Sequence, residues 1–234
     1  MPKKRSKRYE KALKALDGNN KSYPLKQAVE TLVKFSRAKF NESIDLACHL
    51  GVDPKQSDQM VRGTVTLPHG TGKAVKVLVF AKSGAAADAA KAAGAEYVGF
   101  DDMIKKCQEG WTDFDVAVAT PEAMAEVRKL GKVLGPRGLM PNPKTGTVTD
   151  DTAKAVKEVK AGRVEFKLDK GSNLHVAIGK MTFAANQLEE NARAALEAIR
   201  KAKPSGLRGH YLESVTISAT MSPPLPVDLK EFQA

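Results

Sequence analysis

Small hydroxyl side chains recur at every second position near the C-terminal end of the chain. They are Ser214, Thr216, Ser218 and Thr220, with Val215 and Ile217 between them. A strand with this alternation buries one side and presents the other to solvent, so a row of hydroxyls could bond phosphates, ribose hydroxyls and base edges. Lys39-Phe40, an aromatic residue beside a lysine, could pack on ribose or bases. Each feature also has a plainer interpretation, Phe40 as a core residue and the hydroxyls as a solvated strand.

Other motifs that could carry chemistry are incomplete. Gly70-Thr71-Gly72-Lys73 resembles the end of a phosphate-binding loop, but Leu67 stands where that loop needs glycine and Ala74 where it needs Ser or Thr. No G-x-G-x-x-G motif follows the first strand of the central segment. The four histidines have no metal-ligand spacing, and no Ser, His and acid set has a recognisable frame. We therefore expect no catalytic residue, metal or cofactor; a nucleotide-binding enzyme that uses the central segment is the alternative left open.

The positive charge lies mainly at the two ends of the chain. The 234 residues carry a formal net charge of +11, from 38 Lys and Arg against 27 Asp and Glu. Residues 1–70 hold 14 basic and 7 acidic groups, residues 71–159 hold 13 and 12, and residues 160–234 hold 11 and 8. Such an excess favours a polyanionic partner, of which nucleic acid is the commonest in the cytosol.

The apolar content and the cysteines indicate the compartment. No uncharged apolar run approaches the roughly 20 residues of a membrane-spanning helix, and no apolar segment follows the basic N-terminus. We therefore expect no secretory signal, no membrane partner and a cytoplasmic location. Cys48 and Cys107 are too few and too far apart for a disulfide framework, and we expect two buried thiols.

The two ends of the chain have the pattern of a half-exposed sheet covered by helices. Helices are predicted over 6–17, after Pro24, and over 185–202, and strands over 43–50, 60–67, 164–168, 174–178 and 211–220. Lys170-Gly171-Ser172-Asn173 predicts a hairpin between the strands 164–168 and 174–178. The proline-rich tail from Ser222 is predicted not to continue a sheet, because proline lacks an N–H donor.

The central segment alternates strands with helices. The predicted strands are 74–81, 96–98 and 114–119, and the predicted helices are 85–93, 101–109, 121–130 and 150–160. This alternation predicts a parallel sheet. Because it interrupts the pattern that 24–70 begins and 160–234 completes, we predict a two-domain α+β and α/β protein, with a discontinuous outer domain (1–70 plus 159–234) and an inserted α/β domain (71–158).

Two long strings resemble the signatures of a known family. Residues 58–72 (DQMVRGTVTLPHGTG) and 130–147 (LGKVLGPRGLMPNPKTGT) are similar to those of the large-subunit ribosomal protein L-one family, in its bacterial branch. The resemblance continues through Ala38-Lys39-Phe40, Ala161-Gly162-Arg163, Asp169-Lys170 and Thr220-Met221, so it covers nearly the whole chain. It implies that the outer domain is a discontinuous split α/β sandwich that binds RNA, and that the inserted domain is a Rossmann-like parallel-sheet domain.

The resemblance also implies a function. Members of this family are structural constituents of the large ribosomal subunit and are not enzymes. They bind large-subunit ribosomal RNA at the mobile stalk near the tRNA exit site, beside other large-subunit components, and assist release of deacylated tRNA. They also repress translation of their own operon by binding its messenger RNA. The implied partners are therefore ribosomal RNA, own-operon messenger RNA and exit-site tRNA.

The resemblance carries a set of RNA-contacting residues onto this chain. By motif they are Lys39, Phe40, Asp45, Asp169, Lys170, Ser214, Thr220 and Met221, and the alternating hydroxyls add Thr216 and Ser218. An acidic residue in such a site can accept a hydrogen bond from a guanine amino group or a ribose hydroxyl. The family usually follows Thr-Met with glycine, whereas this chain has Ser222. We expect Thr220 and Met221 to lie near Phe40 and next to the turn at 170–173.

Overall fold

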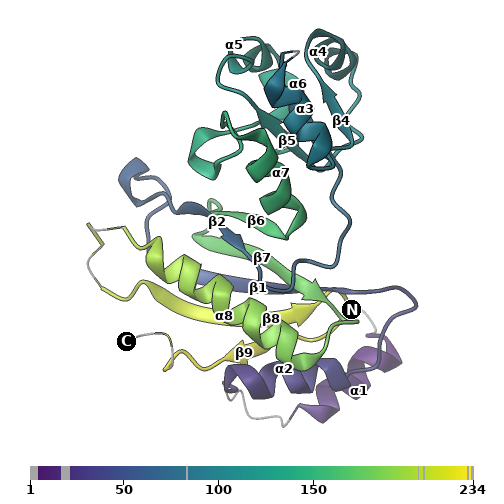
Figure 1. The fold of residues 1–234 in the computed structure, drawn as a ribbon. Coiled ribbons are helices and arrows are strands. Elements are labelled where there is room, and N and C mark those ends of the chain that lie inside the picture. The colour runs from purple at the N-terminus through teal and green to yellow at the C-terminus, as the bar shows by residue number, and fades with distance from the viewer. Residues whose placement is uncertain are drawn as a thin grey trace. The chain divides into compact units, whose positions relative to one another are not determined.

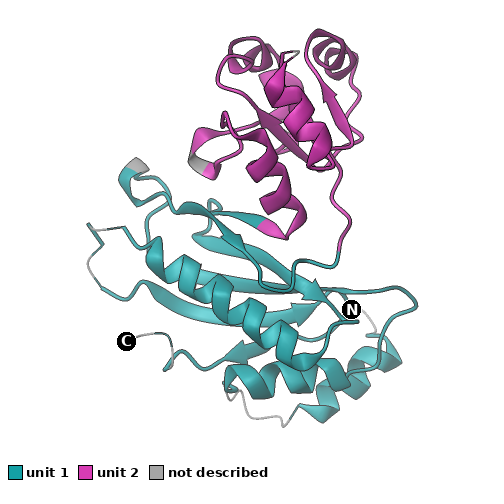
Figure 2. Cartoon of the chain, viewed as in Figure 1, with its two compact units in different colours: residues 1–72, 164–234 teal, residues 73–163 magenta. Residues whose placement is uncertain are grey.

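The computed structural model describes residues 5–16, 22–82, 84–204, 206–207, 209–230 and 232. The chain forms two compact units, residues 1–72 with 164–234 (unit 1) and residues 73–163 (unit 2) (Figure 2). Together they contain an antiparallel sheet and a three-stranded parallel sheet, a mixed α/β architecture. Among the described residues, no helix is long and apolar enough to cross a membrane.

Unit 1 is built around a four-stranded sheet with the order β7-β1-β8-β9 (Figure 1). Its strands are β1 (Ser43–Leu50), β7 (Asn173–Lys180), β8 (Leu212–Ala219) and β9 (Leu225–Val227), and all neighbours are antiparallel. A separate two-stranded sheet joins β2 (Arg62–Thr66) to β6 (Arg163–Lys167). The helices are α1 (Lys7–Ala15), α2 (Leu25–Lys34) and α8 (Ala185–Lys201), with a 3-10 turn at Ser57–Gln59. Asp17, where the first predicted helix ends, lies outside the described residues.

The alternation in the sequence determines which side of this sheet is covered. On β1 the residues Ile44, Leu46, Cys48 and Leu50 are all buried, whereas the residues between them are half-exposed. Val215 and Ile217 of β8 are buried on the same side. The helices α2 and α8 pack on that side, since α8 contacts β7 and α2 contacts β8 and β9. The opposite side of the sheet, which we call the open face, carries the polar positions of the strands.

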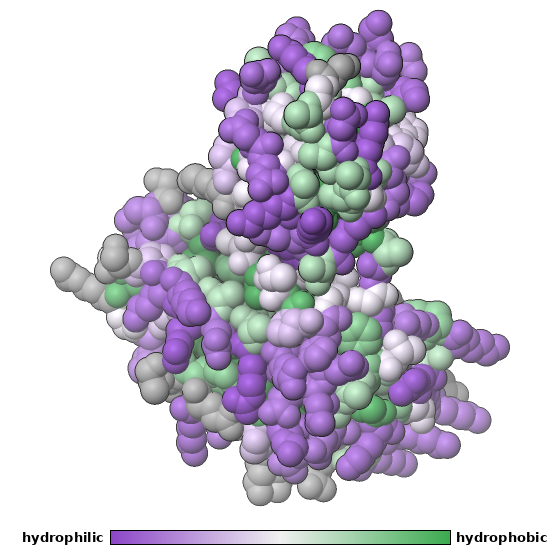
Figure 3. Space-filling model, viewed as in Figure 1, coloured by the Kyte–Doolittle hydropathy of each residue, from purple (hydrophilic) through white to green (hydrophobic). Residues whose placement is uncertain are grey.

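The two covering helices are amphipathic. Leu188, Ala192, Ala195, Leu196 and Ile199 of α8 are buried at helical spacing and belong to one core with the apolar side of the sheet. Seen from the helix side, hydrophilic residues spread over the outer surface of unit 1 (Figure 3). Cys48 belongs to this core, where burial raises the pKa of its thiol to about 12. The prediction of two buried thiols is confirmed for both Cys48 and Cys107.

The predicted hairpin between 164–168 and 174–178 is wrong. A tight turn is present, because the Asp169 N–H donates to the Asn173 carbonyl at 2.8 Å. However, the two arms join different sheets, β6 pairing with β2 and β7 with β1. Next to the turn, each arm is bonded to a different segment. The Leu168 N–H donates to the Val61 carbonyl (3.0 Å), and the Ser172 carbonyl accepts from the Leu50 N–H (2.9 Å). Both arms have the same alternating pattern, which does not specify the strand that each one pairs with.

The prediction that the tail after Ser222 cannot continue a sheet is also wrong, because β9 pairs with β8. Leu225 and Val227 lie opposite Ile217 and Val215, with Pro226 between them. The Pro226 carbonyl accepts a hydrogen bond from the Tyr23 N–H at 2.9 Å, on the side away from β8. In an extended strand the N and the carbonyl of one residue point the same way, so a proline at this position removes no bond to β8.

Unit 2 is a three-layer α/β structure. Its parallel strands have the order β4-β3-β5 and are β3 (Val77–Phe80), β4 (Tyr97–Gly99) and β5 (Val116–Ala119). The helices α3 (Ala85–Ala92) and α7 (Thr152–Lys160) belong to the core on one face, and α4 (Asp101–Gln108) belongs to the other. The helix predicted over 121–130 is divided into α5 (Met124–Val127) and a 3-10 turn (Arg128–Leu130), followed by α6 (Gly131–Leu134). A short 3-10 turn at Pro143–Thr145 lies in the loop between α6 and α7.

The boundary between the units lies a few residues beyond the sequence-based one on each crossing. Lys160 and Arg163 belong to unit 2, where Lys160 bonds Glu96 at 2.8 Å and Arg163 bonds Glu158 at 2.6 Å. With these boundaries unit 1 has 23 basic and 15 acidic residues, and unit 2 has 15 and 12. The net charges are therefore +8 and +3, so unit 2 is more basic than the sequence-based boundaries indicate.

The Gly70-Thr71-Gly72-Lys73 segment leads out of unit 1 and is held by α8. The buried Asn191 side chain donates to the Gly70 carbonyl (3.0 Å) and to the Ile178 carbonyl (2.8 Å), and accepts from the His69 N–H (3.0 Å). Gly72 has a φ of +69°, a conformation that favours glycine. The segment thus has a structural role at the exit from unit 1.

Candidate nucleic-acid interface

The open face of the sheet brings together polar residues from three strands. The register places Asp45 between Ala177 and Ser218, and Ala47 between His175 and Thr216. The next row at the surface has His49 between Asn173 and Ser214. The hydroxyls predicted from the sequence are exposed or half-exposed here, beside imidazole, amide and carboxylate groups. This polar surface offers both hydrogen-bond donors and acceptors, which suits a partner rich in phosphate and ribose.

Asp45 lies near the centre of the open face. Burial raises the pKa of its carboxyl, while the neighbouring His175 and Lys180 act in the opposite direction. The Lys180 ammonium donates to the Ser43 hydroxyl at 2.7 Å on the adjacent row. The carboxylate therefore lies among groups that carry or share protons, where it can accept a hydrogen bond from a base amino group or a ribose hydroxyl.

One end of the open face presents two apolar side chains to solvent. Phe40 and Met221 are each 53% exposed, so the interpretation of Phe40 as a core residue is wrong. Phe40 and the exposed Lys39 lie in the loop before β1, and Met221 follows the end of β8. Next to Met221, the Thr220 hydroxyl accepts from the Ser43 N–H at 3.2 Å. As expected, Thr220 and Met221 lie beside the chain segment that carries Phe40.

A buried carboxylate that the sequence reasoning missed holds this end together. Glu42 is 2% exposed and accepts hydrogen bonds from Ala38 N–H at 2.6 Å, Arg8 Nη1 at 2.9 Å and Met221 N–H at 3.0 Å. Burial alone would raise the pKa of Glu42, but these donors outweigh it and lower the pKa. One side chain therefore ties α1, the loop of Phe40 and the turn of Met221 to each other. The only local signal is that an acidic residue directly precedes an alternating strand, and this signal does not indicate which groups donate hydrogen bonds to it.

The Asp169–Lys170 turn lies at the other end of the open face. Asn173 pairs with His49, six residues along β1 from Ser43, which is about 20 Å at roughly 3.4 Å per residue. The expectation that Thr220 and Met221 lie next to this turn is therefore wrong. The reason is topological: β7 and β8 both run antiparallel to β1, so β8 ends where β1 begins, whereas β7 starts where β1 ends.

Asp169 stabilises its own turn. Its carboxylate accepts from the Asn173 N–H at 2.7 Å and the Gly171 N–H at 2.8 Å, and the Asn173 bond is the main reason why its pKa is lowered. The turn holds Lys170 exposed beyond the strand end. Of this pair, Lys170 supplies the exposed positive charge, and Asp169 sets the shape of the turn.

Two histidines and an asparagine on the open face were not singled out from the sequence as binding residues. His49 Nδ1 lies 2.9 Å from Asn173 Oδ1, and His49 Nε2 lies 3.3 Å from Glu213 Oε2. His175 is exposed one row away. The histidines were considered as metal ligands and as members of a catalytic triad, yet their polar positions in the alternating strands place them on the same side as Asp45. Among the described residues, no group of three or more His, Cys, Asp or Glu side chains could hold a metal ion.

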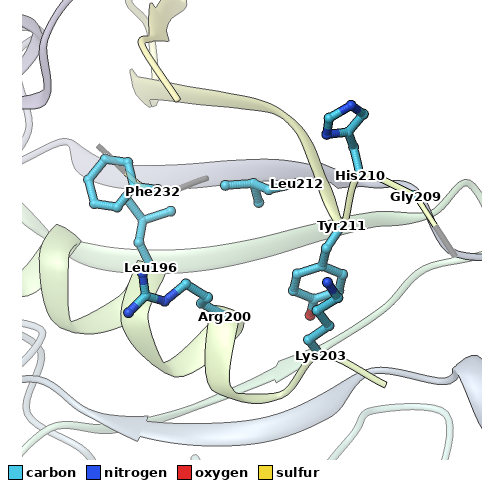
Figure 4. A pocket seen from close by; sticks show the side chains of 8 residues that line it. All are labelled: Leu196, Arg200, Lys203, Gly209, His210, Tyr211, Leu212 and Phe232. Atoms are coloured by element: carbon cyan, nitrogen blue, oxygen red, sulfur yellow. The ribbon is translucent and has the colours of Figure 1, made fainter. Parts of the chain in front are cut away.

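A cavity of about 240 Å³ lies between α8 and the start of β8 (Figure 4). Leu196, Tyr211 and Phe232 form its apolar part, and His210 points away from the helix. The Tyr211 hydroxyl is already used, since it donates to the Ile199 carbonyl at 3.0 Å. This cavity is on the helix side of the sheet and does not belong to the open face.

Comparison with known proteins identifies the family. The model of the Ribosomal protein L1p/L10e family matches residues 32–223. Large ribosomal subunit protein uL1 of Protochlamydia amoebophila is 53% identical over 226 residues, which cover 97% of this chain and 95% of that protein. The uL1 proteins of Kosmotoga olearia (54% over 228 residues, 97% of each chain) and Renibacterium salmoninarum (55% over 225 residues, 96% and 95%) are similar to the same extent.

These relatives are bacterial ribosomal proteins, and their family is structural and non-enzymatic. The resemblance inferred from residues 58–72 and 130–147 is thereby confirmed, and the alternative of a nucleotide-binding enzyme is discarded. The chain belongs to the Ribosomal protein L1p/L10e family.

Proposed function

We propose that the protein is a structural constituent of the large ribosomal subunit and binds large-subunit ribosomal RNA through the open face of unit 1. Membership of a ribosomal protein family places it in the cytoplasm as part of the ribosome. The observation that carries the proposed surface is the pair of exposed apolar side chains, Phe40 and Met221, fixed at one end of a polar sheet face by the buried Glu42. An exposed aromatic ring and an exposed thioether beside a row of polar groups offer surfaces on which unpaired RNA bases can stack.

The surface has the chemistry that folded RNA requires. Its length of about 20 Å between Ser43 and His49 can follow several nucleotides. Lys39 lies at one end and Lys170 at the other, where each can meet a phosphate. Between them the proposed contacts Asp45, Ser214, Thr216 and Ser218 offer hydrogen bonds to ribose and base edges. The remaining proposed contacts are Phe40, Asp169, Thr220 and Met221, with Asp169 acting through the turn that presents Lys170.

The finer parts of the proposal concern which RNA is bound and to what end. We propose that the ribosomal RNA segment is the mobile stalk near the tRNA exit site, and that the protein assists release of deacylated tRNA there. A messenger RNA of its own operon that has a similar structure would bind the same open face, and this binding would repress translation. One surface for both RNAs predicts that they compete with each other.

A gel-shift titration tests the proposal. The full chain should retard the stalk segment of the large-subunit ribosomal RNA in preference to a scrambled RNA of equal length. Unlabelled operon leader RNA should displace the stalk RNA completely, and affinity should fall with salt because counterions are released from neutralised phosphates. Equal affinity for stalk and scrambled RNA would contradict specific binding, and a ternary complex of both RNAs would contradict the shared surface.

A further inference from the structure

A groove lies beside the open face, between the start of α1 and the end of β8. Its volume is about 350 Å³, within the range of roughly 300–1,000 Å³ typical of small-ligand sites. Arg5, Arg8 and Tyr9 line one wall, and Thr220, Met221 and Ser222 line the other. The groove is thus continuous with the Met221 end of the open face, but the helix that forms its first wall supplies none of the contacts proposed so far.

The two arginines of the groove have different surroundings. The Arg8 guanidinium donates to the buried Glu42 carboxylate at 2.9 Å and to the Met221 carbonyl at 3.3 Å. It therefore fixes α1 against the end of β8. Arg5 lies over the ring of Tyr9, with its guanidinium carbon 5.6 Å from the ring centre, and forms no ion pair with a described residue. An exposed arginine over an aromatic ring presents a cation together with a flat face.

The second wall adds an apolar, non-acidic surface. Met221 is 53% exposed, and a thioether packs well on aromatic rings. The Ser222 hydroxyl accepts from the Ala219 N–H at 2.9 Å, so it is turned toward its own strand end. None of the described residues that line the groove is acidic, and the Glu42 carboxylate that holds Arg8 is itself buried and paired.

We infer that this groove binds one unstacked nucleotide of the RNA that occupies the open face. The base lies against Tyr9 and Met221, and Arg5 meets a phosphate next to it. This inference rests on the proposed function, and it adds the N-terminal helix to the RNA interface. An RNA nucleotide matches the groove because aromatic and arginine faces recognise unstacked bases of any sequence, while the arginine charge suits the phosphate.

A pair of Tyr9 variants in the full chain tests the base contact. Tyr9→Phe keeps the ring and should bind the stalk ribosomal RNA as the parent does. Tyr9→Leu keeps an apolar side chain for packing of α1 but removes the ring, and should weaken binding by about 5- to 150-fold. Far-UV circular dichroism shows whether α1 is retained in both. Equal affinity of the two variants would overturn the inference.

A matched pair of charge variants tests the phosphate contact. Arg5→Ala and Lys14→Ala each remove one positive charge, and Lys14 is exposed in the last turn of α1, where it is a surface neighbour of neither Arg8 nor Tyr9. Arg5→Ala should lower the salt slope of binding by about one counterion, whereas Lys14→Ala should leave it unchanged. The same loss in both variants would mean general attraction by the helix and would overturn the site.

Substitution in the RNA separates this inference from the proposed function. Abasic nucleotides are placed singly at the unpaired positions of the stalk RNA, and each RNA is titrated with the parent and with Tyr9→Leu. One abasic position should lower the RNA affinity of the parent about as much as Tyr9→Leu does. On that RNA, Tyr9→Leu should not lower the affinity further. If no position behaves in this way while the parent still binds specifically, the groove inference fails. If the parent does not bind the stalk RNA specifically, the proposed function fails instead.

Discussion

Replacing Glu42 with glutamine leaves the shape of the side chain but removes one of its acceptor oxygens. The carboxylate serves three donors, Ala38 N–H and Arg8 on one oxygen and Met221 N–H on the other. In either orientation the new amide group faces a backbone N–H, so at least one buried donor loses its acceptor. That loss costs about 1–3 kcal/mol, and the weakened charge interaction with Arg8 brings the total to about 2–4 kcal/mol.

The protein contains an internal reference for this measurement. Its single tryptophan, Trp111, packs in unit 2 against Tyr97 and Phe114, with ring centres 4.9 and 5.6 Å away. In urea, Glu42→Gln should lower the midpoint at which unit 1 unfolds, as followed by circular dichroism. It should leave unchanged the midpoint of the tryptophan fluorescence transition, which reports unit 2. Glu165→Gln is the matched control, because Glu165 pairs with Arg62 at the surface and such pairs contribute about 0–1 kcal/mol.

The pH dependence of stability is a second, independent test of the role of Glu42. The folded protein lowers the pKa of Glu42 below its ordinary 4.5, so ionised Glu42 contributes stability above that pH. This contribution is lost as the pH falls through the folded-state pKa. The stability difference between the parent and Glu42→Gln should therefore be constant near neutral pH and shrink in acid. A Glu42→Gln protein as stable as the parent at pH 7, or a difference that grows in acid, would refute the role of Glu42.

Three further outcomes are expected. Replacing residues 73–163 by a short linker should leave stalk RNA affinity within about tenfold, because every proposed contact lies in unit 1; total loss of binding in a protein that circular dichroism shows to be folded would contradict this. Gly63→Ala should cost about 1–3 kcal/mol in urea unfolding, because its Cβ would lie 2.7 Å from the Phe166 ring; unchanged stability would mean that the ring can move. Ser222→Gly should bind RNA as the parent does yet lose about 1 kcal/mol of folding stability, since the hydroxyl accepts from the Ala219 N–H. Weaker binding of the stalk RNA in a gel shift would show instead that Ser222 contacts RNA.

The sequence was sufficient for the features that depend on local periodicity. The period of two along 43–50 predicted which residues of β1 are buried, and each of the four is. The same signal placed Ser214, Thr216 and Ser218 on the exposed side of β8. The alternation of strands with helices predicted the parallel sheet of unit 2. In all of these cases the residues that carry the signal are close together in the chain.

The features that were missed depend on partners far apart in the chain. Glu42 bonds Arg8, 34 residues earlier, and Met221, 179 residues later, and no local pattern can specify such a pairing. The strand around Pro226 was missed because a proline is harmful only where its N–H would face the neighbouring strand. The position of the Asp169 turn follows from the direction of β7, which alternation alone leaves undetermined.

The most direct test of the RNA-binding surface compares two methionines of unit 1. Met221 is 53% exposed at the end of the open face, and Met60 is 45% exposed in the loop before β2. Truncation to alanine removes the same side chain from a similar degree of exposure in each case, so a difference in RNA affinity reports position alone. In equilibrium binding of the stalk ribosomal RNA, Met221→Ala should weaken the complex by about tenfold, or 1.4 kcal/mol, and Met60→Ala should bind as the parent does. Equal affinities of the two variants would contradict the assignment of the open face as the RNA interface.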